Sequence, residues 1–279
     1  MIRNLSLSAT ILLLSIWIFS CKKKVTEEGS PVTFKTISMK EEHHLNDKAK
    51  NPILSIELKY QCPTAFTNEK ILEKIKKIML ADFLPDVADT SGQPEAAMSS
   101  YIKGKIKSYE SAGEIIMDED SPDNGDQPKV AWKDNTNLLI RYNSNRLLSY
   151  TIESSQYSGG AHGGTTFRNS IVDLRSGEKI GEEDLFTEAA IPLINDIILK
   201  KLEAQNQVKT PEELEQIGYF DVAQIEQYKN FYLTKDGLVY TFNQYEIGAY
   251  ALGTIEVTLT FPDLASFISP GSPLEQLMP

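Results

Sequence analysis

Hydrophobic and polar residues alternate along several short stretches of the chain, a pattern that indicates strands with one buried face. The clearest stretch is Ile53–Tyr60, in which every second residue from Leu54 is apolar. Similar patterns predict further strands at Val32–Met39, Leu138–Tyr142, Leu147–Tyr157, Thr165–Leu174, Asn230–Leu233, Leu238–Phe242 and from Ile255 through Val257 and Leu259 to Phe261. The chain is therefore rich in strands, especially in its second half.

Apolar residues at helical spacing separate some of these strands. They predict helices at about Asn68–Leu84, with Thr67 as the cap, at Pro94–Ser111 and at Glu188–Leu202. The run Thr210-Pro211-Glu212-Glu213 has the form of a capping box and predicts a further short helix.

The order of these elements defines the fold class. Short turns, such as Asn143–Arg146 and Lys235-Asp236-Gly237, join strands into hairpins, and helices lie between hairpins rather than after every strand. This order predicts an α+β protein, with antiparallel sheets, helices packed on one face and two consecutive α+β subdomains. We place the boundary between Gly113 and Lys129. The expected limits are residues 32–120 and 129–270, with a tail at 271–279.

The amino terminus has the layout of an export signal. Arg3 precedes the apolar run Leu5–Phe19, which is shorter than the roughly 20 residues of a comfortable membrane span. The sequence Ile18-Phe19-Ser20-Cys21 resembles a bacterial lipobox, although Phe19 is bulkier than that pattern prefers. We expect cleavage of residues 1–20, fatty acyl chains such as palmitate on Cys21, and a flexible tether at 21–31. An ordinary buried cysteine is the alternative.

Lipidation at Cys21 predicts a protein of the bacterial cell envelope, held outside the cytoplasm on a periplasmic or cell-surface membrane face. The whole chain has a formal net charge of −11. Loss of residues 1–20 leaves 27 basic and 39 acidic side chains, a charge of −12. An acidic chain disfavours nucleic acid and favours cationic proteins, peptides or metal ions as partners. The remaining cysteine, Cys62, is expected in the core.

Two segments suggest metal binding but do not satisfy its requirements. The acidic run Asp118–Asp126 does not fit a calcium loop, because Pro122 takes one ligand position and Ala131 stands where a glutamate is required. A solvated loop is favoured, and cation binding there stays open. His43 and His44 are adjacent, so in a strand their rings would point to opposite faces, and an exposed turn is expected. We predict no metal site and no cofactor.

Several motifs together resemble the extracellular domain of RsiV-like anti-sigma factors. They are Tyr157–Gly164 (YSGGAHGG), Ile171–Glu178 (IVDLRSGE), Asp184–Phe186 (DLF), Phe231–Leu238 (FYLTKDGL) and Tyr245–Gly253 (YEIGAYALG). The preceding segment, about Val32–Ser111, is similar to the module that lies before the catalytic domain in PdaC-type peptidoglycan deacetylases. The two resemblances cover nearly all of the expected mature chain.

The resemblance implies an exported α+β protein, and in the best-known members the domain binds host lysozyme and signals to a sigma factor. Only Met1–Asn4 precede the apolar run, so no sigma-factor partner is expected. A deacetylase metal site needs an HxxxH arrangement, which His43, His44 and His162 cannot provide. We therefore predict no catalytic residues.

Candidate ligand-binding residues come from two of the motifs. They are Tyr157, Gly159, Gly160, His162, Gly163, Tyr245, Glu246 and Tyr250. For the first motif the alternative is a sharp turn whose glycines need positive φ, with the His162 ring hydrogen-bonded to its own loop. For the second motif, the alternative is that Tyr245 and Tyr250 are core residues, packed against a bend of the backbone beside Gly248 and Gly253.

These observations leave three functional hypotheses. The leading one is a non-enzymatic lipoprotein that binds a macromolecule, either a basic protein such as a lysozyme-like muramidase or peptidoglycan. The second is a hydrolase of cell-wall glycans with His162, Asp173 or Glu246 as acid and base groups. The third is a structural component of the envelope.

Overall fold

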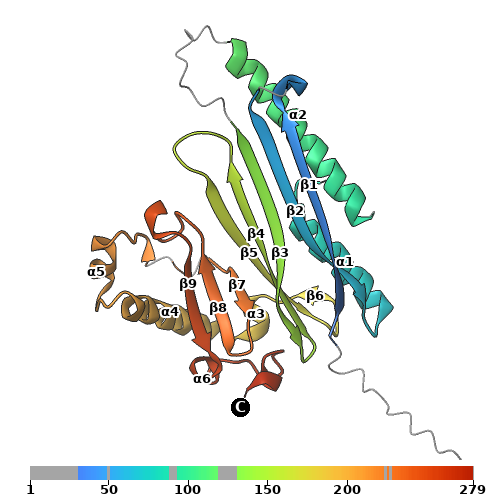
Figure 1. Ribbon diagram of the computed structural model, residues 1–279. Coiled ribbons are helices and arrows are strands. Elements are labelled where there is room, and N and C mark those ends of the chain that lie inside the picture. Colours follow the sequence, from blue (N-terminus) through green and yellow to red (C-terminus); the bar gives the residue numbers. More distant parts are fainter. Residues whose placement is uncertain are drawn as a thin grey trace, which may run out of the picture.

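The strands form two sheets in the computed structural model, which describes residues 31–48, 51–87, 93–118, 131–222, 225 and 228–278 (Figure 1). The larger sheet has the order β1-β2-β3-β4-β5-β6, and the smaller has the order β7-β8-β9. The larger contains β1 (Thr33–His44), β2 (Ile53–Ala65), β3 (Trp132–Ser144), β4 (Leu147–Tyr157), β5 (Gly164–Asp173) and β6 (Glu178–Lys179). The smaller contains β7 (Phe231–Leu233), β8 (Gly237–Phe242) and β9 (Ile255–Thr260).

The helices are α1 (Glu69–Phe83), α2 (Pro94–Asp118), α3 (Glu182–Leu185), α4 (Ile191–Gln205), α5 (Pro211–Gln216) and α6 (Phe261–Leu264). Short 3-10 turns occur at η1 (Leu45–Asp47), η2 (Glu188–Ala190), η4 (Tyr250–Leu252) and η5 (Glu275–Leu277). The cap of α1 differs from the prediction, because the Asn68 side chain, not Thr67, accepts the free backbone N–H groups.

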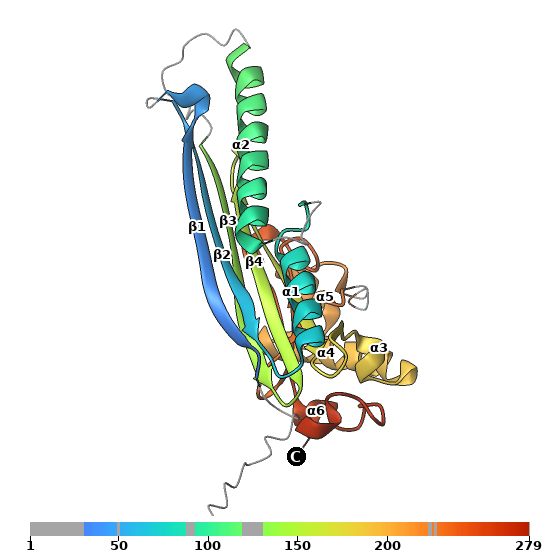
Figure 2. The ribbon, with the colours of Figure 1, turned by 90° about the vertical axis from the view of Figure 1, so that its right-hand side faces the viewer.

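The predicted α+β class is confirmed, with one addition. All pairs in the two sheets are antiparallel except β2 with β3, where Leu54–Lys59 lies parallel to Trp132–Asn137. Parallel neighbours need a long crossover connection, and α1 and α2 lie within it. Figure 2 shows both helices along one face of β1–β4.

The two hydrophobic cores lie on opposite faces of the larger sheet. Leu148, Tyr150 and Ile152 of β4 join the core beneath α1 and α2, whereas the neighbouring Leu147 joins the core shared with β7–β9 and α4. The larger sheet continues across the boundary predicted between residues 113 and 129, since β2 and β3 are paired. The predicted tail also packs on the fold, because Leu274 is fully buried and Gln276 donates to the Asn145 carbonyl at 2.6 Å.

Several predicted features fall outside the described residues. They are the signal peptide, Cys21, all but the last residue of the tether, and the acidic segment after Asp118. Among the residues that are described, no helix has the length and apolar character needed to cross a membrane.

A buried carboxyl in the second core gives the fold a pH dependence. Glu182 is 3% exposed, accepts a hydrogen bond from the Tyr240 hydroxyl at 2.8 Å and lies 3.8 Å from the Lys229 ammonium. Burial raises the pKa of Glu182. The folded state therefore binds a proton on the Glu182 carboxyl more tightly than the unfolded chain does. Stability consequently falls as pH rises from the pKa of Glu182 in the unfolded chain to its higher pKa in the folded protein.

We expect Glu182→Gln to be at least as stable as the wild type at pH 7, because the amide keeps an acceptor for Tyr240 without a buried charge. The advantage should shrink as the pH is lowered through the ordinary carboxyl range. Urea denaturation between pH 4 and 7 measures it, with the exposed neighbour Glu183→Gln as control. A loss of stability in Glu182→Gln that is largest at pH 7 would contradict the expectation.

Candidate functional site

The glycine-rich motif forms the loop between β4 and β5. Gly159 and Gly160 have φ of 100° and 89°, which side-chain-bearing residues rarely adopt, so the predicted need for positive φ is confirmed. The Tyr157 hydroxyl donates to the Gly160 carbonyl at 3.0 Å and closes the loop. The His162 ring lies 3.3 Å through Nδ1 from the Gly163 carbonyl and is exposed.

A row of amide side chains, two from the loop between β8 and β9 and one from the residue before β7, joins the smaller sheet to this hairpin. Gln244, Asn243 and Asn230 accept hydrogen bonds from the backbone N–H groups of residues 165, 167 and 169 on β5, at 3.1, 2.7 and 2.9 Å. These are alternate residues, so the three amides occupy the free edge of β5 where another strand would pair. They fix the position of the second motif relative to the first.

The two motifs meet in a row of aromatic rings, which we call the aromatic row: His162, Tyr250 and Tyr245. The rings of His162 and Tyr250 are stacked, with centroids 3.8 Å apart and planes at 20°. Those of Tyr250 and Tyr245 are 5.8 Å apart. The Tyr250 hydroxyl also donates to the Gly163 carbonyl at 2.9 Å. Residues almost ninety positions apart in the sequence thus form one continuous surface.

The aromatic row is accessible to solvent. Tyr245 is 58% exposed, and Tyr157, beside the row, is 37% exposed. Tyr245 also has a φ of 69°, which is unusual for a bulky side chain and costs about 1–2 kcal/mol. The predicted alternative, in which the tyrosines pack a bend as core residues, does not describe Tyr245. An exposed aromatic ring held at a backbone cost is typical of a binding surface.

Glu246 does not take part in this surface as a free carboxylate. Its oxygens accept from the backbone N–H of Asn243 at 2.7 Å and from the Asn243 side chain at 3.3 Å. It therefore stabilises the turn that presents Tyr245. Asp173, a further acidic group of the hydrolase hypothesis, is not brought to this surface, because it ends β5 nine residues from Gly164, about 30 Å along the strand.

The histidine pair ends strand β1 instead of lying in an exposed turn, so that prediction was wrong. The His43 ring pairs with Glu110 of α2, and His44 Nδ1 lies 3.0 Å from the Asn51 carbonyl. The two rings have different partners because adjacent strand residues point to opposite faces. Within the described part of the chain, no group of three or more His, Cys, Asp or Glu residues could hold a metal ion.

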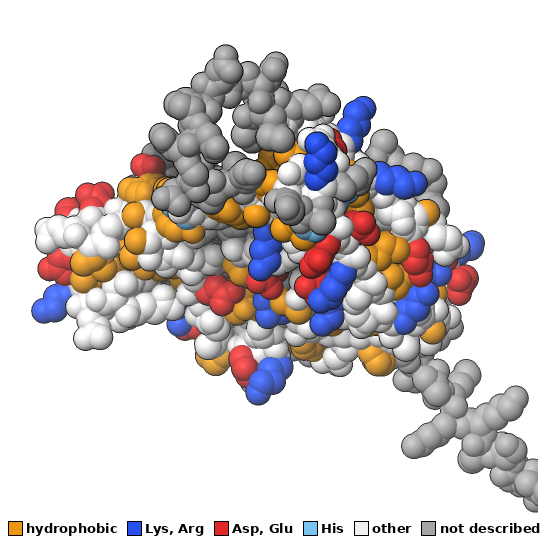
Figure 3. Space-filling view, turned by 45° about the horizontal axis from the view of Figure 1, so that its top comes forward, with side chains coloured by type: hydrophobic (Ala, Val, Ile, Leu, Met, Phe, Trp, Pro, Cys, Tyr) orange, Lys and Arg blue, Asp and Glu red, His pale blue; other side chains and the backbone are white. Residues whose placement is uncertain are grey.

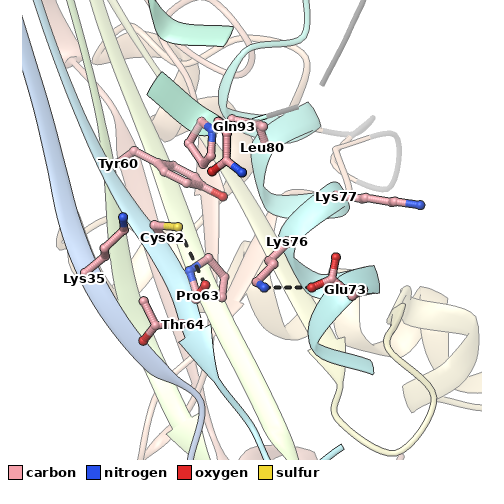
Figure 4. Close-up of a pocket in the computed structure, with 11 residues that line it drawn as sticks. Lys35, Tyr60, Cys62, Pro63, Thr64, Glu73, Lys76, Lys77, Leu80 and Gln93 are labelled. Atoms are coloured by element: carbon pink, nitrogen blue, oxygen red, sulfur yellow. Dashed lines mark hydrogen bonds and ion pairs between the residues drawn. The ribbon is translucent and has the colours of Figure 1, made fainter. Parts of the chain in front are cut away.

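A cavity of 520 Å³ lies between β2 and α1 (Figure 4). Tyr60 and Cys62 border it from β2, and Lys76 and Glu73 form an ion pair at 2.7 Å on its α1 side. Cys62 is buried, as predicted, and burial raises the pKa of its thiol. The thiol is therefore protonated at neutral pH, when it is a poor nucleophile.

Comparisons with known proteins agree with this architecture. The family model described as "Deacetylase PdaC" matches residues 47–165, and that of "Protein of unknown function (DUF3298)" matches residues 183–261. The chain thus contains a PdaC-like segment, which runs through β2–β4, and a DUF3298 segment from α3 to β9. The glycine-rich motif lies within the first match and Tyr245–Gly253 within the second, so the aromatic row joins the two.

Solved structures share the fold. A crystal structure of a DUF3298 family member from Bacteroides fragilis matches with a TM-score of 0.79 and 24% identity, over 87% of this chain and 97% of that chain. A DUF3298 family protein from Pseudomonas aeruginosa matches with a TM-score of 0.57 and 16% identity, over 90% of this chain and 98% of that chain. The comparison with curated proteins gave no match. The family matches indicate a protein related to the cell envelope.

Proposed function

We propose that this protein is a non-enzymatic, lipid-anchored binding protein of the bacterial cell envelope, which captures a basic macromolecule such as a lysozyme-like muramidase. The observation that carries the proposal is the aromatic row, in which His162, Tyr250 and Tyr245 from two distant motifs form one exposed surface. Tyrosine is among the residues that contribute most binding energy at protein interfaces, because its ring covers a large area with few rotatable bonds.

The net charge supports a cationic partner. A charge of −11 would draw a basic protein toward the chain and raise its rate of association. On the face that Figure 3 shows, acidic and basic side chains are interspersed among apolar ones, so on that face the surplus does not form a single patch. In this proposal the overall charge speeds the encounter, and the aromatic row determines where the partner binds.

Isothermal titration calorimetry of the full chain in detergent against lysozyme tests the proposal. We expect binding at low salt that weakens as ionic strength rises, since charges are screened beyond about 8 Å at 0.15 M. Tyr245→Ala should lower the affinity about tenfold or more, because the most important interface aromatics contribute about 2 kcal/mol.

The matched control is Leu193→Ala, which removes a side chain of similar exposure, 50%, from α4. It should bind within twofold of the wild type. If the wild type does not bind lysozyme at low salt, the muramidase proposal fails. If Tyr245→Ala and Leu193→Ala bind equally well, the aromatic row is not the binding surface.

The lipid anchor is a separate part of the proposal. It rests on the lipobox-like sequence before Cys21 and on the first strand beginning at Thr33, which leaves a spacer between lipid and fold. Intact-mass spectrometry of the membrane fraction should show a chain that starts at Cys21 and carries acyl chains. An unprocessed amino terminus or an unmodified Cys21 would disprove the anchor without affecting the binding proposal.

A further inference from the structure

A second group of polar residues lies on the face of the β4–β5 hairpin that α1 and α2 cover. Successive strand residues point to opposite faces, so Ser154 and Gln156 of β4 share the face of Leu148, Tyr150 and Ile152, which belong to the core beneath these helices. Two cavities, of 330 and 480 Å³, open on this helix-covered face. Both are lined by Asp86 and Tyr101, so they are neighbouring compartments of one cleft, which we call the α2 cleft.

The floor of the α2 cleft contains a buried carboxylate. Asp134 of β3 is 4% exposed, and its Oδ2 accepts from the Tyr101 hydroxyl at 2.9 Å, the Lys105 ammonium at 2.8 Å and the Gln156 amide at 3.4 Å. All three donors line the cleft. Burial raises the pKa of Tyr101 to about 12, so its hydroxyl remains protonated.

The second oxygen of this carboxylate is not satisfied. Asp134 Oδ1 is buried and has no hydrogen-bond partner among the described residues. An unpaired buried polar atom costs about 1–3 kcal/mol, more when it is charged. An apolar residue at this inward-facing strand position would avoid that cost. A carboxylate kept there at a cost, with three donors arranged around it, is typical of a functional site rather than of a packed core.

The walls of the α2 cleft fit an uncharged ligand rich in hydroxyl groups. Its charged side chains sum to no net charge, because Lys105 and Arg168 are matched by Asp86 and by Asp134 beneath the cleft. Most of the other polar wall groups are hydroxyls: Ser100, Ser108, Thr136, Ser154 and Thr166. Such groups both donate and accept hydrogen bonds, as sugar hydroxyls do.

The α2 cleft also has an aromatic side chain and two compartments of a size that suits sugar rings. Trp132, at the start of β3, lines the larger cavity and is partly exposed, so its ring can pack against the apolar face of a sugar. Both cavities have volumes within the range of about 300–1,000 Å³ that is usual for small-molecule sites. Two adjoining compartments suit consecutive rings of one chain.

We propose that the α2 cleft is a binding site for a neutral oligosaccharide. Its residues are distinct from the aromatic row, so the site does not depend on the proposed binding of a basic protein. In this assignment Gln156, Lys105 and the hydroxyl groups pair with the sugar hydroxyls, Trp132 packs against a ring, and Asp134 orients the donors.

Gly104 of α2 offers a direct test. It lines the larger cavity, and a Cβ built on it meets no atom within 4 Å. Gly104→Phe therefore adds a large side chain at the wall of the cleft with no clash at its Cβ, and replacement of a helical glycine by phenylalanine should stabilise α2 by about 0.5 kcal/mol. The matched control is Ser111→Phe, two helical turns along on the same helix, at an exposed position outside the lining of either cavity.

The probes are the hexamer of β-1,4-linked N-acetylglucosamine and maltohexaose, titrated by calorimetry into the full chain in matched detergent. We expect one or both to bind the wild type, Gly104→Phe to lose at least tenfold in affinity with an unchanged or higher melting temperature, and Ser111→Phe to bind within twofold. Failure of both hexamers to bind the wild type, or equal binding by Gly104→Phe and the wild type, would overturn the assignment. The lysozyme titration is unaffected by either result.

Discussion

Gly237→Ala is expected to destabilise the protein strongly, by about 3 kcal/mol or more. Gly237 begins β8 with a φ of 152°, and a Cβ at this position would lie 2.0 Å from the Leu259 carbonyl oxygen and 2.8 Å from the Thr260 Cα. Both are backbone atoms of the paired strand β9, so no rotation of a side chain can relieve the contact. The strands must separate locally, which weakens the three-stranded sheet.

Thermal denaturation followed by circular dichroism measures this effect. For a chain of this size, 3 kcal/mol corresponds to a fall of roughly 10 °C in melting temperature. The control is Gly253→Ala, at a φ of 70° and a ψ of −153° with no atom within 4 Å of the added Cβ, which should cost only the penalty of a backbone conformation that glycine alone adopts readily, about 1–3 kcal/mol and less than the loss in Gly237→Ala. Equal losses in the two variants would show that backbone conformation, not the close approach to β9, makes Gly237 necessary.

The sequence predicted the elements whose burial follows a simple period. β2 and α1 were found because their fully buried positions are apolar or aromatic, as in Leu54, Ile56 and Leu58. The start of β3 was missed for the corresponding reason. Asp134 and Thr136 occupy inward-facing positions before Leu138, so the expected alternation begins only at Leu138 although the strand begins at Trp132. The residues that obscured the strand are those that line or underlie the α2 cleft.

Long-range pairing could not be predicted from local patterns. The parallel register of β2 with β3 joins residues almost eighty positions apart, and a local pattern does not encode which strands become neighbours. The amide row of Asn230, Asn243 and Gln244 was also missed, since these residue types are equally common in turns. The glycine-rich and tyrosine motifs were selected through a family resemblance, and only the three-dimensional structure shows that their rings stack.

Asp82→Ala is the second variant with a large expected effect, because Asp82 joins α1 to three strands of the larger sheet. One oxygen accepts from the Tyr150 hydroxyl at 2.7 Å and the Ser170 hydroxyl at 3.0 Å, and the other pairs with the Lys179 ammonium at 2.5 Å. Tyr150 is fully buried, so loss of the carboxylate leaves its hydroxyl without this acceptor. Hydrogen bonds to charged groups contribute about 1.5–3 kcal/mol each, and we expect a total loss of about 3 kcal/mol.

An exposed ion pair between the same two parts of the fold provides the control. Lys74 of α1 pairs with Glu178 of β6, and both side chains are more than half exposed, so Glu178→Ala should cost no more than about 1 kcal/mol. Urea denaturation of Asp82→Ala, Tyr150→Phe and the double variant then isolates the buried contact. If Asp82 acts through Tyr150, the double variant loses less than the sum of the single losses. Strict additivity would place the stabilisation in the contacts to Ser170 and Lys179, and a loss no larger than that of Glu178→Ala would show that Asp82 does not hold α1 on the sheet.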